Sequence, residues 1–190
     1  IVASLVGSEM CIRDRVLGGH GYVKEWGMEQ IVRDARIGQI YEGANGIQAI
    51  DLVGRKVVRD GGQTLKELID EIIATGVDDE FAPALREVCE RLTAVTESVV
   101  NRSKQDPNLP GAVSVDFLDF VGLTLCAWMW ARMASCAPQD EFGAAKRATA
   151  RYFYARLLPQ TLGLERSISA EADAVMLSLI HISEPTRLAT

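Results

Sequence analysis

Apolar residues that recur every three or four positions constrain the fold of this chain more than any other feature. Within residues 81–104, steps of three and four residues separate Leu85, Val88, Leu92, Val95 and Val99. This period places apolar side chains on one face of a helix. No segment alternates with the two-residue period of a strand. The sequence therefore predicts an all-α fold, a helical bundle.

The same spacing predicts further helices over residues 28–40, 45–57, 64–75 and 141–160. Asn45 is expected to cap the second of them. Thr64 followed by Glu67 forms a capping-box pattern, which predicts that Thr64 caps the third. Gly61 and Gly62 separate these two helices and are expected to form a linker.

Residues 113–136 are the most apolar stretch of the sequence. Asp119 and Arg132 bound an uncharged run of 12 residues, shorter than the roughly 20 residues that cross a bilayer. We therefore expect a buried bundle helix and no membrane span, with Trp128 and Trp130 packed in the bundle. The cysteines of the predicted helices are expected to be small core residues: Cys89, Cys126 and Cys136.

The charge balance argues against two classes of partner. The chain has 20 Lys and Arg residues against 26 Asp and Glu residues, a net charge of -6, which is unsuited to binding nucleic acid or anionic lipid. The 4 cysteines and 2 histidines lack paired spacing, so neither a disulfide framework nor a metal site is expected. This cysteine usage favours a reducing, cytoplasmic location.

The two ends encode the same DNA on opposite strands. Residues 5–15, LVGSEMCIRDR, can be back-translated into DNA whose reverse complement encodes LSLIHISEPT and allows the following Arg, as in residues 177–187. A sequencing adapter ligated to both ends of a DNA fragment has this property. We therefore expect residues 1–15 and 177–190 to be adapter-derived and non-native. Cys11 and His181 then carry no biological information.

Two glycine-rich breaks flank the helix expected over residues 28–40. Gly18, Gly19 and Gly21 allow close approach of a ligand to the backbone, although the same pattern also fits a helix-ending turn. Glu42 follows an apolar approach that could bury it and raise its pKa, as a general base requires. On composition alone it could equally be a solvated loop residue. His20 could contact a phosphate or serve in packing.

The order VLGGHGY, VRDARI and IYEGANGIQ within residues 16–58 resembles the end of the C-terminal helical domain of the acyl-CoA dehydrogenase family. The helices after Gly61 resemble the C-terminal extension of a subset that includes the 3-methylmercaptopropionyl-CoA dehydrogenases. We therefore expect residues 16–60 to end the dehydrogenase domain and residues 61–176 to form the extension. The resemblance implies FAD-dependent α,β-dehydrogenation of an acyl-CoA to a trans-2-enoyl-CoA, with Glu42 as the base.

By the same resemblance, Tyr41 and Gly43 contact the acyl-CoA. Two stretches match residues that contact FAD in the family. The first, which matches contacts with the FAD of a partner subunit, is Val16, Leu17, Gly18 and Gly19. The second is Ala44, Asn45 and Gly46. Ala44 departs from the family's frequent Thr and lacks its hydroxyl. A homodimer or tetramer, and an electron-transfer flavoprotein as acceptor, are implied in the same way.

The resemblance covers only the end of such an enzyme, so we expect this chain alone to be inactive. Two alternatives stay open from the sequence. An acyl-CoA oxidase would share these motifs and pass electrons to oxygen. A non-enzymatic helical dimerisation module would keep only the surface of the family.

Overall fold

The computed structural model describes residues 23–27, 29–30, 44–78, 80–173 and 175. Every regular element in these ranges is helical, which confirms the all-α prediction. The chain divides into two compact units, Ile1–Ile47 and Gln48–Thr190. The division falls inside helix α3, Ala44–Ile50.

Besides the start of α3 and the helical residues Glu29 and Gln30, the described part of the first unit contains one short element. This element, η2, is a 3-10 turn over Lys24–Trp26. It ends at Gly27, whose φ of 66° is left-handed and whose N–H donates to the carbonyl of Lys24 over 3.0 Å. A left-handed residue suits glycine because it has no Cβ. The helix expected over residues 28–40 lies mostly outside the described residues.

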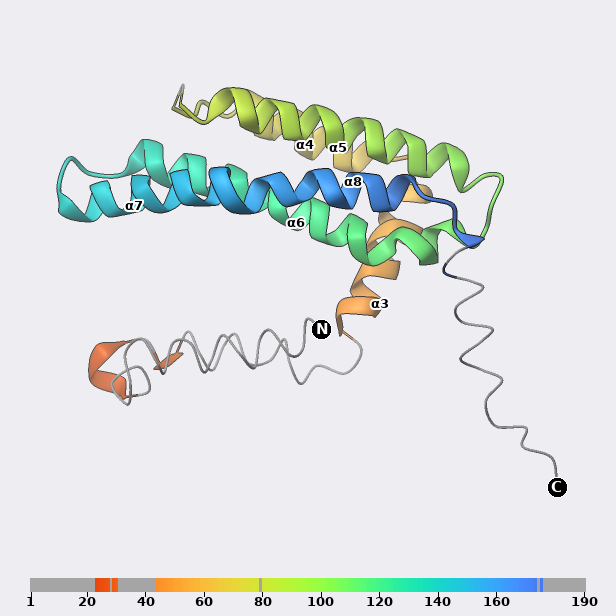
Figure 1. Ribbon diagram of the computed structural model, residues 1–190, viewed down its shortest axis with the longest axis horizontal. Coiled ribbons are helices and arrows are strands. Elements are labelled where there is room, and N and C mark those ends of the chain that lie inside the picture. Colours follow the sequence, from red (N-terminus) through yellow and green to blue (C-terminus); the bar gives the residue numbers. More distant parts are fainter. Residues whose placement is uncertain (1–22, 28, 31–43, 79, 174, 176–190) are drawn as a thin grey trace. The chain divides into compact units, whose positions relative to one another are not determined.

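The second unit is a helical bundle in which α6 is central. Figure 1 shows α5, α6 and α8 running alongside one another, with α4 beside α5. Its elements, in chain order, are the π-helix η3 Asp51–Val58, α4 Gln63–Ala74, α5 Ala82–Arg102, α6 Leu109–Cys136, α7 Glu141–Tyr152, the π-helix η4 Phe153–Leu157, the 3-10 helix η5 Leu158–Gln160 and α8 Thr161–Ser169.

Helix α6 provides the largest buried side chains of the core. Phe117 and Phe120 are 0% exposed, and α5, α7, α8 and η3 all pack against this helix. By length and composition alone, α6 could also cross a membrane. Trp128 and Trp130 are half-buried and pack against the core, as the sequence predicted.

Two predicted helix starts are wrong. Helix α3 already begins at Ala44, so Asn45 lies within its first turn and does not cap it. Helix α4 begins at Gln63 after Gly62, and Thr64 makes no capping hydrogen bond to the backbone. The Asp60 carboxylate instead accepts from the backbone N–H groups of Gly62 (2.8 Å) and Thr64 (3.1 Å). A carboxylate ahead of the helix satisfies these donors in place of the predicted capping box.

The break before α8 was missed by the sequence analysis, which predicted one helix over residues 141–160. The α-helical pattern of α7 ends at Tyr152 and passes through η4 and η5 before α8 begins. Pro159 lies in η5. Since proline lacks an N–H and crowds the preceding turn, it disfavours an uninterrupted α-helix at this point.

The core assignment of the cysteines is right for one residue and wrong for two. Cys89 is fully buried, whereas Cys126 and Cys136 are exposed and all three are free thiols. Cys126 and Cys136 lie on the same face of α6 as the exposed Met129 and Met133. The apolar composition of α6 therefore extends around its surface, so an apolar side chain there does not indicate burial.

Candidate functional site

The first turn of α3 carries three of the residues expected to contact a flavin. Ala44, Asn45 and Gly46 open this helix, and the last two are exposed. Apart from its chain neighbours and the backbone of its own helix, no atom lies within 4 Å of the position that a Cβ on Gly46 would occupy. No side chain therefore covers the backbone at Gly46. The exposure of Asn45 and Gly46 is what contact with a ligand at this turn would require.

The other sequence-predicted site residues lie outside the described residues. They are Glu42, Tyr41 and Gly43, and the earlier stretch Val16, Leu17, Gly18 and Gly19. His20, the other residue considered for phosphate contact, lies outside as well. Of the predicted site, the structure therefore brings together only the start of α3.

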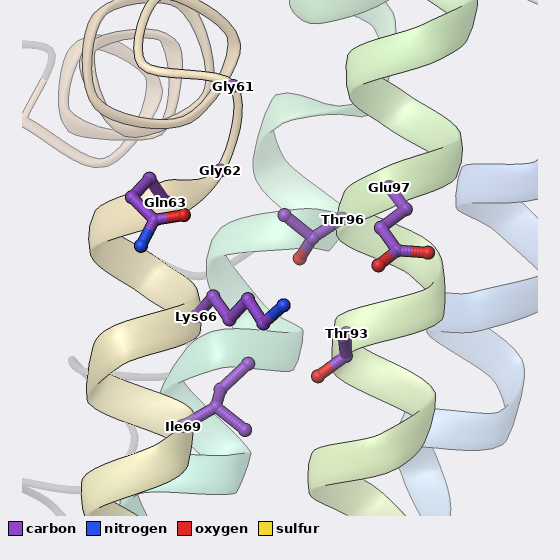
Figure 2. Close-up of a pocket in the computed structure, with 8 residues that line it drawn as sticks. All are labelled: Gly61, Gly62, Gln63, Lys66, Ile69, Thr93, Thr96 and Glu97. Atoms are coloured by element: carbon purple, nitrogen blue, oxygen red, sulfur yellow. The ribbon is translucent and has the colours of Figure 1, made fainter.

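A pocket between α4 and α5 was not anticipated from the sequence. It has a volume of about 170 Å³ and is lined by Gly61, Gly62, Gln63, Lys66, Ile69, Thr93, Thr96 and Glu97. Figure 2 shows Lys66 extending from α4 toward Thr93 and Glu97 on α5. Its lining comes from two helices about thirty positions apart, so no local sequence motif could reveal it.

The chemistry of this pocket suits water or a small polar molecule. Thr96 donates to the carbonyl of Leu92 over 2.7 Å, and Thr93 donates to that of Cys89 over 3.0 Å. Both hydroxyls thus keep only acceptor capacity toward the pocket. Lys66 and Glu97 place opposite charges on facing walls. Such a lining does not match an acyl chain, which needs apolar walls.

Asp60 holds the turn beside this pocket. Hydrogen bonds from the Thr64 side chain and from the backbone N–H groups of Thr64 and Gly62 hold the pKa of Asp60 below its ordinary value of 3.8. These contacts favour the ionised carboxylate. The first N–H groups of α4 therefore already have an anionic partner within the chain.

Buried polar groups elsewhere in the second unit serve packing. Burial, and after it the charge of Glu90, raises the pKa of the Cys89 thiol to about 11, so the thiol stays protonated and unreactive at neutral pH. Burial also raises the pKa of Tyr154, whose hydroxyl donates to the carbonyl of Ala127 over 3.0 Å. Neither group is an activated nucleophile.

No group of three or more His, Cys, Asp or Glu side chains in the described ranges could hold a metal ion. The described part of the chain therefore offers one candidate for cofactor contact, the start of α3. The described residues of the second unit present no activated nucleophile and no metal-binding cluster.

Comparison with known proteins identifies the family of this chain. A family model described as the acyl-CoA dehydrogenase C-terminal domain matches residues 8–57. A second, described as acetyl-CoA dehydrogenase C-terminal like, matches residues 65–178, more than half of the 190 residues. The chain belongs to the acyl-CoA dehydrogenase family. The resemblance found in the sequence is confirmed.

Individual acyl-CoA dehydrogenases show the same relationship. The chain is 34% identical over 177 residues to 3-methylmercaptopropionyl-CoA dehydrogenase of Ruegeria pomeroyi, covering 85% of this chain and 30% of the relative. It is 31% identical over 168 residues to the broad-specificity linear acyl-CoA dehydrogenase FadE5 of Mycobacterium tuberculosis, covering 76% of this chain and 28% of the relative. The chain thus spans under a third of the length of these relatives.

A shorter match links the chain to an enzyme complex. The caffeyl-CoA reductase-Etf complex subunit CarC of Acetobacterium woodii is 38% identical over 53 residues, or 27% of this chain and 14% of that subunit. Acyl-CoA dehydrogenases are flavoprotein oxidoreductases that use FAD and act on acyl-CoA.

Proposed function

We propose that this chain is the C-terminal part of an FAD-dependent enzyme that oxidises an acyl-CoA thioester to a trans-2-enoyl-CoA. The observation that carries the proposal is the match of two adjoining family models, the first of which spans the Tyr41-Glu42-Gly43 stretch and the start of α3. The exposed Asn45 and Gly46 support flavin contact at that start. The enzyme's middle and upstream domains would provide the rest of the site.

In this proposal Glu42 removes the proton from the carbon α to the thioester carbonyl. That proton is acidified by the carbonyl, and a carboxylate placed beside it in a desolvated site is a competent base. When bound, FAD accepts the hydride that leaves the β carbon. Tyr41 and Gly43 flank the base and contact the acyl-CoA.

Two stretches of the chain would hold FAD. Ala44, Asn45 and Gly46 contact the flavin of their own subunit, with one hydrogen bond fewer than a Thr at position 44 would allow. Val16, Leu17, Gly18 and Gly19 contact the FAD of a partner subunit, so the enzyme works as a homodimer or tetramer. An electron-transfer flavoprotein is the proposed acceptor, and the relationship to an Etf complex subunit supports it.

The domain limits form a separate part of the proposal. Residues 16–60 end the dehydrogenase domain and residues 61–176 form the extension, because the two family matches stop at residue 57 and resume at residue 65. Residues 1–15 and 177–190 are proposed to be adapter-derived. Sequencing the source locus across the Arg15/Val16 and Met176/Leu177 junctions tests this, since native codons that continue the present sequence outward would contradict it.

The free thiols of Cys89, Cys126 and Cys136 support a cytoplasmic location for the enzyme. Fractionating cells that express the complete gene product with an epitope tag would check this. Recovery of the protein in an oxidising compartment would contradict it.

A substitution of the proposed base tests the reaction directly. In the complete enzyme, Glu42→Gln should keep FAD bound and slow the acyl-CoA-induced bleaching of the flavin by roughly 10²- to 10⁴-fold, the usual contribution of a general base. Stopped-flow absorbance measures this. Glu25→Gln, a change at an exposed position in η2, serves as the control and should bleach at the wild-type rate.

The outcomes of this experiment separate the alternatives. Unchanged bleaching in the Glu42→Gln enzyme would show that another group is the base. Rapid reoxidation with peroxide release would instead indicate an acyl-CoA oxidase. A complete gene product that purifies without flavin would favour the non-enzymatic module.

A further inference from the structure

Helix α6 carries a second apolar stripe, on the face turned away from the core. The residues of this outer stripe recur at steps of three and four positions and are exposed or half-buried: Val115, Leu118, Gly122, Cys126, Met129, Met133 and Cys136. A helix that is apolar on every side is normally buried on every side. An exposed apolar patch that runs along most of a helix therefore indicates a binding surface.

The outer stripe is symmetric about its own midpoint. Positions at equal distances from the point between Leu125 and Cys126 both belong to the stripe: 122 and 129, 118 and 133, 115 and 136. Two antiparallel α6 helices related by a two-fold axis at this point would pair these positions across the contact. An interface between two identical copies has to be self-complementary in this way.

The residues at positions 122 and 129 are complementary in size. Apart from its chain neighbours and the backbone of its own helix, no atom lies within 4 Å of a Cβ built on Gly122. Gly122 lines a hollow of about 590 Å³ between α6 and α8, together with Leu118, Leu123 and Leu164. Met129 is 39% exposed, and a methionine side chain adapts to an irregular apolar gap. Antiparallel pairing places Met129 of each copy over Gly122 of the other.

The charges beside the outer stripe are complementary as well. Asp119 lies in its first half, where burial and the neighbouring Asp116 raise the pKa of the carboxyl group. Lys146 of α7 lies beside its second half, 6.0 Å from the centroid of the Trp130 ring. Neither Asp119 nor Lys146 forms an ion pair within the described residues. Asp119 and Trp130 are about three helical turns apart and so lie on the same side of α6. In the antiparallel pair, Asp119 of each copy therefore faces Lys146 of the other.

We propose that the outer stripe of α6 binds a second copy of this chain, with the two α6 helices antiparallel about a two-fold axis between Leu125 and Cys126. A single pair of helices buries less than the roughly 800 Å² per partner of a standard stable complex. The contact is therefore reversible, and Cys126 is open to reagents in the dissociated protein. The inference does not depend on the proposed reaction.

Oxidative cross-linking of the complete protein reads this contact directly. Cys126 lies next to the two-fold axis, so its two copies come within the roughly 7 Å between Cα atoms that a disulfide tolerates. Cys136 is exposed on the same face and serves as the internal control, because its two copies would be roughly 30 Å apart. After treatment with copper phenanthroline, peptide mass spectrometry should find the Cys126–Cys126 disulfide at least about tenfold more often than the Cys136–Cys136 disulfide.

A charge exchange tests the direction of the pairing. Asp119→Lys should lower the yield of the Cys126–Cys126 disulfide by about three- to tenfold, because it places two like charges against each other at both ends of the contact. Adding Lys146→Asp to the same chain should restore the yield. Circular dichroism checks that both variants are folded.

Equal linking of Cys126 and Cys136 would mean random collision and would overturn the inference. No linking of Cys126 would overturn it too, since another part of the enzyme or a different partner would then cover α6. An Asp119→Lys protein that links as well as wild type would contradict the antiparallel arrangement. None of these results depends on whether the protein binds FAD or oxidises an acyl-CoA.

Discussion

At the scale of single residues, Arg91 connects three helices of the bundle. From α5, its guanidinium donates to Glu165 over 3.0 Å and to Thr161 over 2.8 Å, both on α8. The same group lies 5.6 Å from the centroid of the Phe120 ring on α6. With its side chain 20% exposed, Arg91 makes charge-assisted contacts that water screens only partly.

We expect Arg91→Ala to lower the free energy of unfolding by about 2–3 kcal/mol, because it removes two charge-assisted hydrogen bonds and leaves Glu165 without its partner. Urea unfolding of the chain measures this. Arg55→Ala is the control, since the Arg55 side chain is 80% exposed and pairs with Asp51 one turn away. That change should cost less than about 0.5 kcal/mol, and equal losses would refute the connecting role of Arg91.

The cysteines should differ sharply in reactivity. At neutral pH, iodoacetamide should modify the exposed Cys126 and Cys136 while leaving the buried Cys89 unmodified until the protein unfolds. The raised pKa of Cys89, about 11, also keeps its thiolate scarce until the solution is strongly alkaline. Peptide mass spectrometry would locate the labels. Early labelling of Cys89 in the native protein would contradict the packing of α5.

These residues show why a candidate site could be predicted from the sequence whereas the environment of each side chain could not. Tyr41-Glu42-Gly43 is a contiguous motif, so its resemblance to a family could be recognised without any structure. The contacts of Arg91 with Thr161 and Glu165 span about seventy positions, and no local pattern encodes them. The Asp60 cap was missed because Thr64 and Glu67 carry the more familiar signature.

At the scale of elements, the turn between η3 and α4 depends on two glycines for different reasons. Both have positive φ, but only Gly62 faces a neighbouring side chain, Thr96. For Gly61 the surrounding space is open. Backbone conformation therefore limits substitution at both positions, and packing adds a second limit at Gly62.

Alanine at the two positions should separate these effects. Gly61→Ala should cost about 1–2 kcal/mol, the cost of a left-handed conformation for a residue with a Cβ. Gly62→Ala should cost about 1–3 kcal/mol more, because the added methyl group overpacks the contact with Thr96. Thermal or urea unfolding measures both. Equal costs would mean that α4 and α5 are not in contact at this turn.

The sequence predicted some helices more accurately than others. The limits of α5 agree with prediction to within two residues because its stripe is regular and Asp106-Pro107 breaks the chain after it. α8 was not predicted, because the helix predicted over residues 141–160 ends just after Pro159, directly before α8 begins at Thr161. The buried side chains of η3 are covered by three other helices. The periodicity of the sequence could therefore predict an apolar face on η3 but not which helices cover it.

At the scale of the whole molecule, the extension and the end of the dehydrogenase domain share one core. The two family matches divide the chain between residues 57 and 65, whereas the compact units divide between residues 47 and 48. Homology and packing thus place the boundary differently. The difference arises because η3 is matched with the dehydrogenase domain but buried with the extension.

The proposed function requires the complete protein to be a flavin enzyme that acts on acyl-CoA. The most direct test is an anaerobic titration of the purified complete protein with acyl-CoA thioesters of graded chain length, following the visible absorbance of the flavin. The protein should carry FAD, and at least one thioester should bleach the flavin in proportion to the amount added and yield the trans-2-enoyl-CoA. A protein without flavin, or a flavin that no thioester reduces, would contradict the proposed function.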